Sequence, residues 1–403
     1  AFLRARWRHL LFVEGLFLVL FLFGLLLRWN NPDLWHPWRG GEKPGDLALL
    51  NAILKSASFP PYDPWLSGNY VNYYYFGYVI LGNLIKLLKM APYVAYNIAL
   101  PMLFSLTGIG AFSVAMDLVE GVRRRNRPAQ NESSQALPWA KKALIAGLAA
   151  AIMVVLLGNL GQLAVIVGGW NRLGGDDGFW LLETARGMVR NFTGERIPTY
   201  TSSWYWDATR IIPPGEGEAG PITEFPFFTF LYADLHAHMI NMPLLLLSLA
   251  WSLGLAQAAD RLAAGHEKRR SILEQAIMLV LVLVVGGLSI GVLRATNTWD
   301  WPTMWGVGSV AIVYASWRVF RQDWRWLLAA GLGLMVLAVL SWLFFLPYIQ
   351  NFGPAYTQVL RWEGGITPVW AYLAVHGLFL FLLVTILGRE FAVWTRSLTD
   401  EGL

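Results

Sequence analysis

Two acidic residues at the start of a predicted helix, Glu42 and Asp46, are the first candidates for chemistry in this chain. The spacing of the apolar residues in 47–54 predicts an amphipathic helix that begins at Asp46. Aspartate is a preferred N-cap residue, so one interpretation is that Asp46 caps this helix. The other is that Asp46 is a general base that accepts a proton from a substrate hydroxyl, with Glu42 as the neighbouring candidate. The two interpretations are compatible, because a carboxylate has two oxygens.

A second group of candidates contains Asp234, His236 and His238, preceded by Glu224. In an extended segment all three of the closely spaced residues share a face, whereas in a helix only Asp234 and His238 do. Mixed imidazole and carboxylate ligands suit divalent transition metals. We therefore predict that these four residues hold a divalent ion such as Mg, Mn or Zn. The alternative is that the histidines form hydrogen bonds with backbone groups at the top of a helix.

Seven further residues are candidates for substrate binding. The tyrosines of 73–75 offer flat faces for stacking a sugar ring, although an aromatic belt at the level of the lipid head groups has the same composition. The planar fork of Arg294 suits a phosphate or diphosphate, and the alternative is a simple pair between Arg294 and Asp300. The candidates are Asp63, Tyr73, Tyr74, Tyr75, Arg294, Asn297 and Asp300.

The composition shows the environment in which these residues work. Of 403 residues, 56% are hydrophobic and only 14% are charged, against about 25% charged in soluble proteins. So much apolar surface requires lipid as a solvent, which excludes a cytosolic enzyme. The chain has no cysteine, which excludes disulfides, iron–sulfur clusters and cysteine zinc sites. A net charge of +5, scattered along the chain, excludes nucleic acid as a partner.

Apolar runs of about 20 residues, the length that a bilayer core requires, predict an all-α, multi-pass membrane protein with about eight spans. The spans lie near residues 9–28, 94–119, 143–168, 239–258, 272–293, 302–317, 327–346 and 368–387. A weaker run, 73–89, contains tyrosines, an asparagine and two lysines, so we expect a helix that lies flat at the membrane interface. Two long loops, about 29–93 and 169–238, then fall on one side of the membrane, and we expect these loops to contain interfacial helices.

The distribution of basic residues predicts the orientation, because cytoplasmic segments carry an excess of Lys and Arg. If 73–89 lies flat, the arginine cluster of 123–127 falls on the same side as the basic residues of 4–8. We therefore expect both termini in the cytoplasm, both long loops outside, and residues 1–403 forming one domain of the plasma membrane. All the candidate residues then belong to outer loops or outer ends of spans, which favours a site for a lipid-borne substrate.

Several long motifs resemble the uncharacterised Chlor_Arch_YYY membrane proteins of bacteria and archaea. The first is Gly-Glu-Lys-Pro-Gly-Asp-Leu-Ala-Leu-Leu-Asn-Ala-Ile-Leu, which begins at Gly41. The others are Pro-Pro-Tyr-Asp-Pro-Trp-Leu-Ser-Gly, Asn-Tyr-Tyr-Tyr-Phe-Gly-Tyr, Glu224-Phe-Pro-Phe-Phe, Tyr232-Ala-Asp-Leu-His-Ala-His238 and Arg294-Ala-Thr-Asn-Thr-Trp-Asp-Trp-Pro302. This resemblance covers most of the chain, but it implies no activity, because none is established for the family.

The order of elements is similar to that of the GT-C glycosyltransferases, which use sugars linked to lipid phosphates. In both, a first span precedes a long outer loop with an early acid and surface helices, and a basic cytoplasmic loop follows the second span. The similarity implies that Asp46, or its neighbour Glu42, is the catalytic base.

Our leading hypothesis is therefore a GT-C-like transferase that moves a sugar from a polyprenyl-phosphate donor to an acceptor at the outer face. Asp46 would deprotonate the acceptor, Arg294 would hold the leaving phosphate, and the histidine group would bind a metal or the acceptor. One alternative is a non-catalytic subunit of a membrane complex, with the aromatic loops as a docking surface for other subunits. Another is a lipid or solute transporter, which the nearly uncharged spans disfavour.

Overall fold

The computed structural model describes most of the chain, and its helices fall into two compact units. The described residues are 2–36, 41–125, 141–176, 178–198, 206–215, 220–265, 271–321, 323–353, 358, 361 and 363–400. Unit 1 comprises Ala1–Leu156 and Phe230–Thr357, and unit 2 comprises Leu157–Thr229 and Gln358–Leu403. Arg127 of the predicted basic cluster lies outside the described residues.

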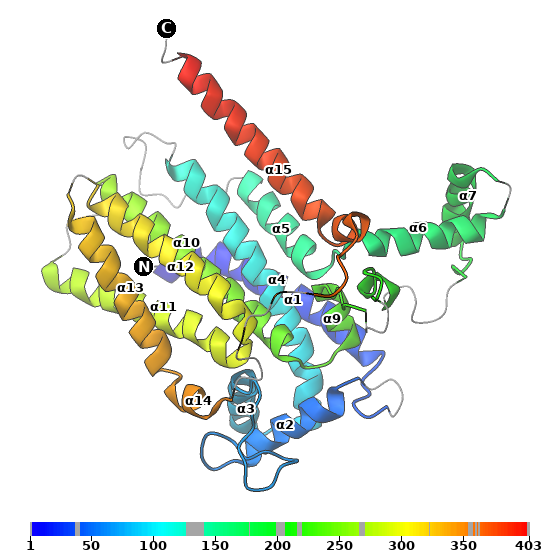
Figure 1. Ribbon diagram of the computed structural model, residues 1–403, viewed down its shortest axis with the longest axis horizontal. Coiled ribbons are helices and arrows are strands. Elements are labelled where there is room, and N and C mark those ends of the chain that lie inside the picture. The colour runs from blue at the N-terminus through cyan, green and yellow to red at the C-terminus, as the bar shows by residue number, and fades with distance from the viewer. Residues whose placement is uncertain are drawn as a thin grey trace. The chain divides into compact units, whose positions relative to one another are not determined.

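Unit 1 contains the candidate residues of the predicted loop 29–93 and those that follow residue 230. Its longer helices are α1 (Phe2–Trp29), α4 (Pro92–Arg125), α5 (Lys141–Val155), α10 (Ala237–Ala263), α11 (Ile272–Thr296), α12 (Trp301–Val319) and α13 (Arg325–Leu343). Its short elements are α2 (Lys43–Lys55), α3 (Phe76–Leu88), the 3-10 turn η3 (Thr298–Asp300) and α14 (Leu346–Asn351). The short helices α2, α3 and α14 lie together at one end of the long ones (Figure 1).

Unit 2 contains α6 (Leu160–Gly174), α7 (Trp180–Phe192), the 3-10 turn η2 (Asp207–Thr209) and α15 (Val369–Asp400). Helix α7 packs along α6, and α15 also contacts α6. The short helix α9 (Pro226–Tyr232) crosses the boundary between the units in the sequence. Apart from one antiparallel bridge between Tyr62 and Tyr70, the regular structure of the described residues is helical.

Six helices are long and apolar enough to cross a membrane, or seven if a broken pair counts as one span. The six are Trp7–Trp29, Pro92–Arg123, Ala237–Ala263, Ile272–Thr296, Arg325–Leu343 and Val369–Arg396. The broken pair replaces the single helix expected at 143–168. Helix α5 ends at Val155, and α6 begins after Asn159, whose side chain accepts a hydrogen bond from the backbone N–H of Gln162. A capping asparagine thus starts a new helix within the apolar run.

Two other predicted helices differ in their suitability for spanning. The run at 302–317 forms α12, which has 19 residues but is not among the six. Tryptophan, tyrosine and serine residues lower its mean hydropathy, and it packs among α10, α11 and α13. The weak run at 73–89 forms α3, whose 13 residues extend only ~20 Å. That length is too short for a hydrocarbon core of about 30 Å.

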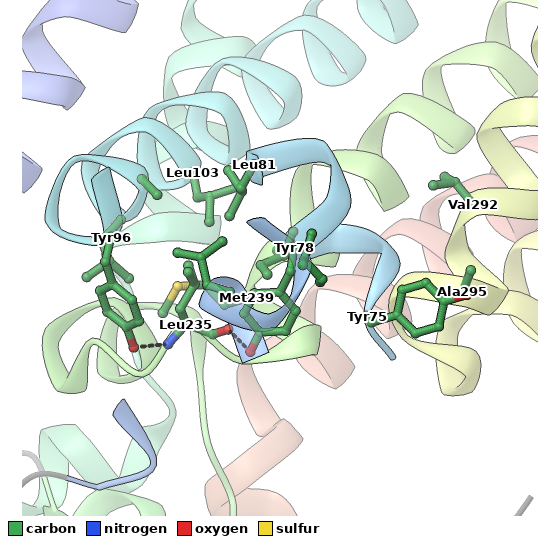
Figure 2. Packing of buried hydrophobic residues seen from close by; sticks show 14 of the residues in the cluster. Tyr75, Tyr78, Leu81, Tyr96, Leu103, Leu235, Met239, Val292 and Ala295 are labelled. Carbon is green, nitrogen blue, oxygen red and sulfur yellow. Dashed lines mark hydrogen bonds between the residues drawn. The ribbon is translucent and has the colours of Figure 1, made fainter. Parts of the chain in front are cut away.

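One hydrophobic cluster joins α4, α10, α11 and α12 of unit 1 to α2 and α3. Tyr78, Tyr96, Leu235 and Met239 are among its fully buried members. Figure 2 shows Tyr78 of α3 and Tyr96 of α4 on opposite sides of Leu235, which precedes α10. Residues from three distant parts of the sequence therefore meet where α10 begins.

Candidate functional site

A buried ion pair fixes the start of α2 to the segment before α10. The Lys43 ammonium lies 2.8 Å from Asp234 Oδ1, and both side chains are only 4% exposed. The other oxygen of Asp234 accepts a hydrogen bond of 2.9 Å from the backbone N–H of Glu42. The ammonium also lies 4.6 Å from the centre of the Tyr232 ring, where a cation–π interaction adds to the ion pair. Removing one partner would leave the other charge buried and uncompensated.

The loop before α2 is shaped to fit this ion pair. Gly41 has a φ of +60°, and a side chain at this position would collide with the Asp234 carboxylate. Glycine satisfies both conditions, because it adopts positive φ at little cost and has no Cβ. On the other side, Ala233 has a φ of 66°, which is unfavourable for a residue with a side chain. Ala233 thus adopts an unfavourable backbone conformation next to Asp234, whereas Gly41 avoids a clash with the Asp234 carboxylate.

A pair formed by an exposed acid and a half-buried histidine borders the buried ion pair. Nε2 of His236 lies 3.0 Å from Oε2 of Glu42, and the side chain of Glu42 is 74% exposed. The same nitrogen lies 3.8 Å from Oδ2 of Asp234, so His236 is within ion-pair distance of both carboxylates. Glu42 is therefore the carboxylate of this cluster that a molecule from solvent can reach.

Asp46 occupies the opposite environment, one helical turn further along α2. It is 4% exposed, and its two oxygens face the hydroxyl groups of Tyr78 at 2.8 Å and Tyr96 at 3.3 Å. The expectation that the helix begins at Asp46 is wrong, because α2 starts at Lys43 and Glu42 occupies the cap position. In the first turn, the carboxylate of Asp46 still interacts favourably with the positive end of the helix dipole.

The hydrogen bonds around Asp46 depend on one proton. The Tyr78 hydroxyl lies 2.8 Å from both Asp46 Oδ1 and the carbonyl oxygen of Leu235, but it has a single proton to donate. When Asp46 is ionised, Tyr78 shares its single proton between the two acceptors. When Asp46 is protonated, it can donate to the Tyr78 oxygen, and Tyr78 then donates to Leu235 alone. The Tyr96 hydroxyl meanwhile accepts a hydrogen bond of 2.8 Å from the backbone N–H of Leu235 (Figure 2). The neutral acid thus satisfies this network best.

Burial raises the pKa of Asp46 to about 6, although nearby His236 and the hydrogen bond from Tyr78 act in the opposite direction. Burial and the adjacent Asp46 also raise the pKa of Tyr78, which keeps its proton. Asp46 therefore changes its protonation state near pH 6.

A second polar cluster lies where α11 ends and α12 begins. Oδ2 of Asp300 accepts hydrogen bonds from the side-chain amides of Asn241, at 2.7 Å, and Asn297, at 2.8 Å. The guanidinium of Arg294 lies 5.4 Å from the centre of the Trp301 ring. Within the described residues, Arg294 has no carboxylate at ion-pair distance. The alternative that Arg294 simply pairs with Asp300 is therefore wrong, because two amides hold Asp300 instead.

The two clusters lie at the same end of α10. His236 caps α10, and Asn241 follows five residues later, which corresponds to ~8 Å along the helix axis. Gly77 of α3 lies close to the neighbouring Ile240 and to Thr296, with which a side chain at position 77 would collide. The close approach of α3 thus brings the acid–histidine cluster and the Arg294 cluster to one region of unit 1.

The three tyrosines predicted to bind substrate have different neighbours. Tyr75 is buried, with its ring 5.4 Å from that of Tyr348, and the ring of Tyr74 is 5.6 Å from that of Phe352. Burial, with the nearby charges of Asp46 and Glu42, raises the pKa of Tyr73 to about 12. Tyr73 is thus the member of the triplet that lies beside the acids, whereas the other two pack around α14.

Two further candidates form hydrogen bonds with residues close to them in the sequence. Oδ1 of Asp63 accepts hydrogen bonds from the backbone N–H groups of Trp65 and Leu66, at 2.8 and 2.9 Å, and so holds a turn. Glu224 belongs to unit 2, where its carboxylate accepts a hydrogen bond of 3.2 Å from Thr229.

The predicted metal ligands are only partly brought together. Asp234 and His236 lie in the non-helical segment before α10, whereas His238 is within α10, with its ring 5.4 Å from that of His236. In the described part of the chain, no three His, Cys, Asp or Glu side chains are grouped as metal ligands. Lys43 already neutralises Asp234, so a metal ion beside this carboxylate would face a buried like charge. The observed donor set does not fit a divalent ion at Asp234.

Four residues of the site were not identified from the sequence: Lys43, Tyr78, Tyr96 and Asn241. Lys43 follows Glu42 directly in the first motif, and Tyr78 ends the tyrosine motif. The two motifs therefore contained these residues, but their partners depend on contacts between distant segments. Tyr96 and Asn241 lie in apolar helical runs, where polar side chains are candidates for function by default.

Comparison with known proteins identifies a family and no activity. The chain belongs to the family described as uncharacterized membrane protein (DUF2298), whose model matches residues 2–400. No curated protein and no solved structure matches the chain. Family membership and the six apolar helices agree on a multi-pass membrane protein.

Proposed function

We propose that this protein is a membrane glycosyltransferase that moves a sugar from a polyprenyl-phosphate donor to an acceptor hydroxyl at the outer face of the plasma membrane. The observation that supports it most is the position of Glu42. This carboxylate is exposed and lies beside His236. Arg294, which has no carboxylate partner among the described residues, belongs to the same unit. An accessible base and a cation for phosphate are the two groups that sugar transfer requires.

In this proposal, Glu42 accepts the proton of the acceptor hydroxyl while the hydroxyl oxygen attacks the anomeric carbon of the sugar. The bond between that carbon and the phosphate oxygen breaks, and its electron pair leaves with the polyprenyl phosphate. Arg294 stabilises the added negative charge through its planar fork of donors. No metal ion is assigned to Asp234 in this proposal, because Lys43 already holds that carboxylate.

The roles of Glu42 and Asp46 follow from their exposure. A general base must come within hydrogen-bond reach of the proton that it removes. Glu42 meets this condition, whereas both oxygens of Asp46 face buried tyrosines. We therefore assign Glu42 to direct contact with the acceptor and Asp46 to positioning the start of α2 through Tyr78.

The test is transfer of radiolabelled sugar from a panel of polyprenyl-phosphate hexoses by the purified full chain in lipid nanodiscs. Glu42→Gln should lower kcat by ~100-fold or more, the lower range for a general base. Arg294→Gln should lower kcat by a similar factor, because it removes the cation that stabilises the leaving phosphate. Glu195→Gln is a matched control, since this exposed carboxylate belongs to unit 2. Full activity of Glu42→Gln would remove the proposed base.

The result would also separate the proposal from its alternatives. If the wild-type chain transfers no sugar from any donor, and mass spectrometry of co-purified material finds other membrane proteins but no polyprenyl lipid, the subunit interpretation replaces the enzyme. Uptake of a labelled solute or lipid by proteoliposomes, without any transfer, would instead favour a transporter.

A further inference from the structure

Helix α7 presents an apolar stripe that no other described residue covers. Leu181, Leu182, Val189 and Phe192 are each more than half exposed, and Met188 is 38% exposed. At 100° per residue these positions fall on one face of the helix. Phe179, Trp180 and Phe192, all exposed, mark the two ends of the stripe, and aromatic side chains favour the interface between lipid and water.

The opposite face of α7 is fixed to α6 by backbone contacts. A methyl group on Gly187 would collide with the carbonyl oxygen of Trp170, and one on Gly174 would collide with that of Glu183. The buried side chain of Glu183 accepts a hydrogen bond of 2.7 Å from the backbone N–H of Gly178 and another from Asn171. Because the face of α7 that contains Gly187 packs against α6, the apolar stripe faces away from α6.

Basic residues border the stripe on one side. Arg186 and Arg190 are exposed and lie one helical turn apart, next to Leu182 and Val189 on the helix surface. One guanidinium nitrogen of Arg190 donates to the carbonyl oxygen of Leu173, which orients this side chain at the border. A row of guanidinium groups beside an apolar stripe complements a layer of anionic phosphates above hydrocarbon.

We propose that α7 is a membrane-binding helix that lies in the surface of the bilayer, with its stripe in the acyl boundary and its arginines on anionic lipid head groups. At ~20 Å long, α7 cannot span a bilayer, but a helix of this kind inserts ~5–10 Å deep when it lies flat. This role is independent of any sugar transfer.

The absence of cysteine from the chain makes a direct test simple. Single cysteines would be introduced by Leu182→Cys and Val189→Cys on the stripe, and by Glu195→Cys as an exposed polar control beyond the helix. Each full-length variant would carry an environment-sensitive fluorophore in nanodiscs of phosphatidylcholine and phosphatidylglycerol. Quenching by lipids with a doxyl group near the head group would be compared with quenching by aqueous iodide.

We expect strong doxyl quenching and weak iodide quenching at positions 182 and 189, with the reverse pattern at position 195. Equal iodide quenching at all three positions would overturn the proposal, because the stripe would then face water. Protection from both quenchers at 182 and 189 would also overturn it, because a protein partner would then cover the stripe.

The contact between the arginines and anionic head groups can be tested separately. Arg186→Glu in the Val189→Cys background should reduce doxyl quenching in discs that contain phosphatidylglycerol, and have a smaller effect in discs of phosphatidylcholine alone. Each arginine near an anionic surface raises the membrane-binding constant by about fivefold. An equal effect in both lipids would contradict the assignment of the arginines to anionic head groups.

Discussion

Glu42 at the N-cap of α2 and Asp46 in its first turn are only four residues apart, yet their surroundings differ in exposure, contacts and electrostatics. Around Asp46, two tyrosine hydroxyls replace water, and burial raises the pKa of the carboxyl to about 6. Around Glu42, solvent covers most of the side chain, and within the described part of the chain its ion-pair contact is with His236. The comparison teaches that two acids of one motif can lie in opposite environments: Asp46 is held inside the fold, whereas Glu42 is accessible from solvent.

The largest effect on stability is expected from breaking the buried ion pair between Lys43 and Asp234. Lys43→Met should destabilise the protein by ~3–5 kcal/mol, because it leaves the charge of Asp234 buried without a partner. The apparent melting temperature of the detergent-solubilised chain, followed by tryptophan fluorescence, measures this loss. Lys141→Met, which removes an exposed lysine at the start of α5, is the control. If both variants melt at the same temperature, the Lys43–Asp234 pair does not hold the two segments together.

The next effect is a change in pH dependence. The folded protein favours the protonated form of Asp46, so the stability linked to this group is fully present below its unfolded pKa of 3.8 and is lost as pH rises through about 6. Asp46→Asn cannot ionise and should lack this loss, which is ~3 kcal/mol at most. The melting temperature of the variant should therefore rise relative to the wild type between about pH 4 and pH 7. A difference that is constant over this range would contradict a raised pKa.

The smallest effect on stability is expected from substitution of the exposed acid, Glu42. Glu42→Gln should leave the melting temperature nearly unchanged, because exposed ion pairs contribute little. Together with the loss of transfer activity proposed for the same variant, this result would separate the two regions. A drop as large as that of Lys43→Met would show that Glu42 is structural, and the contrast between the acids would fail.

The sequence was sufficient to predict the membrane class and the short α3, because both follow from local hydropathy and length. It was also sufficient to select Glu42, Asp46, Asp234 and His236, since polar residues are conspicuous in an apolar chain. It could not predict that Lys43 neutralises Asp234, because that contact joins residues 191 positions apart. The break between Val155 and Leu160 was missed for a different reason, namely that hydropathy averages conceal a single capping asparagine.

Leu235 shows how little regular structure this region needs. Its N–H donates to the Tyr96 hydroxyl, and its carbonyl oxygen accepts from the Tyr78 hydroxyl. Two tyrosine side chains thus satisfy the backbone groups that neighbouring strands would satisfy in a sheet. The direction in which the chain enters α10 is therefore set by the separation of α3 and α4. A change in that separation would redirect His236 without altering any residue of the loop itself.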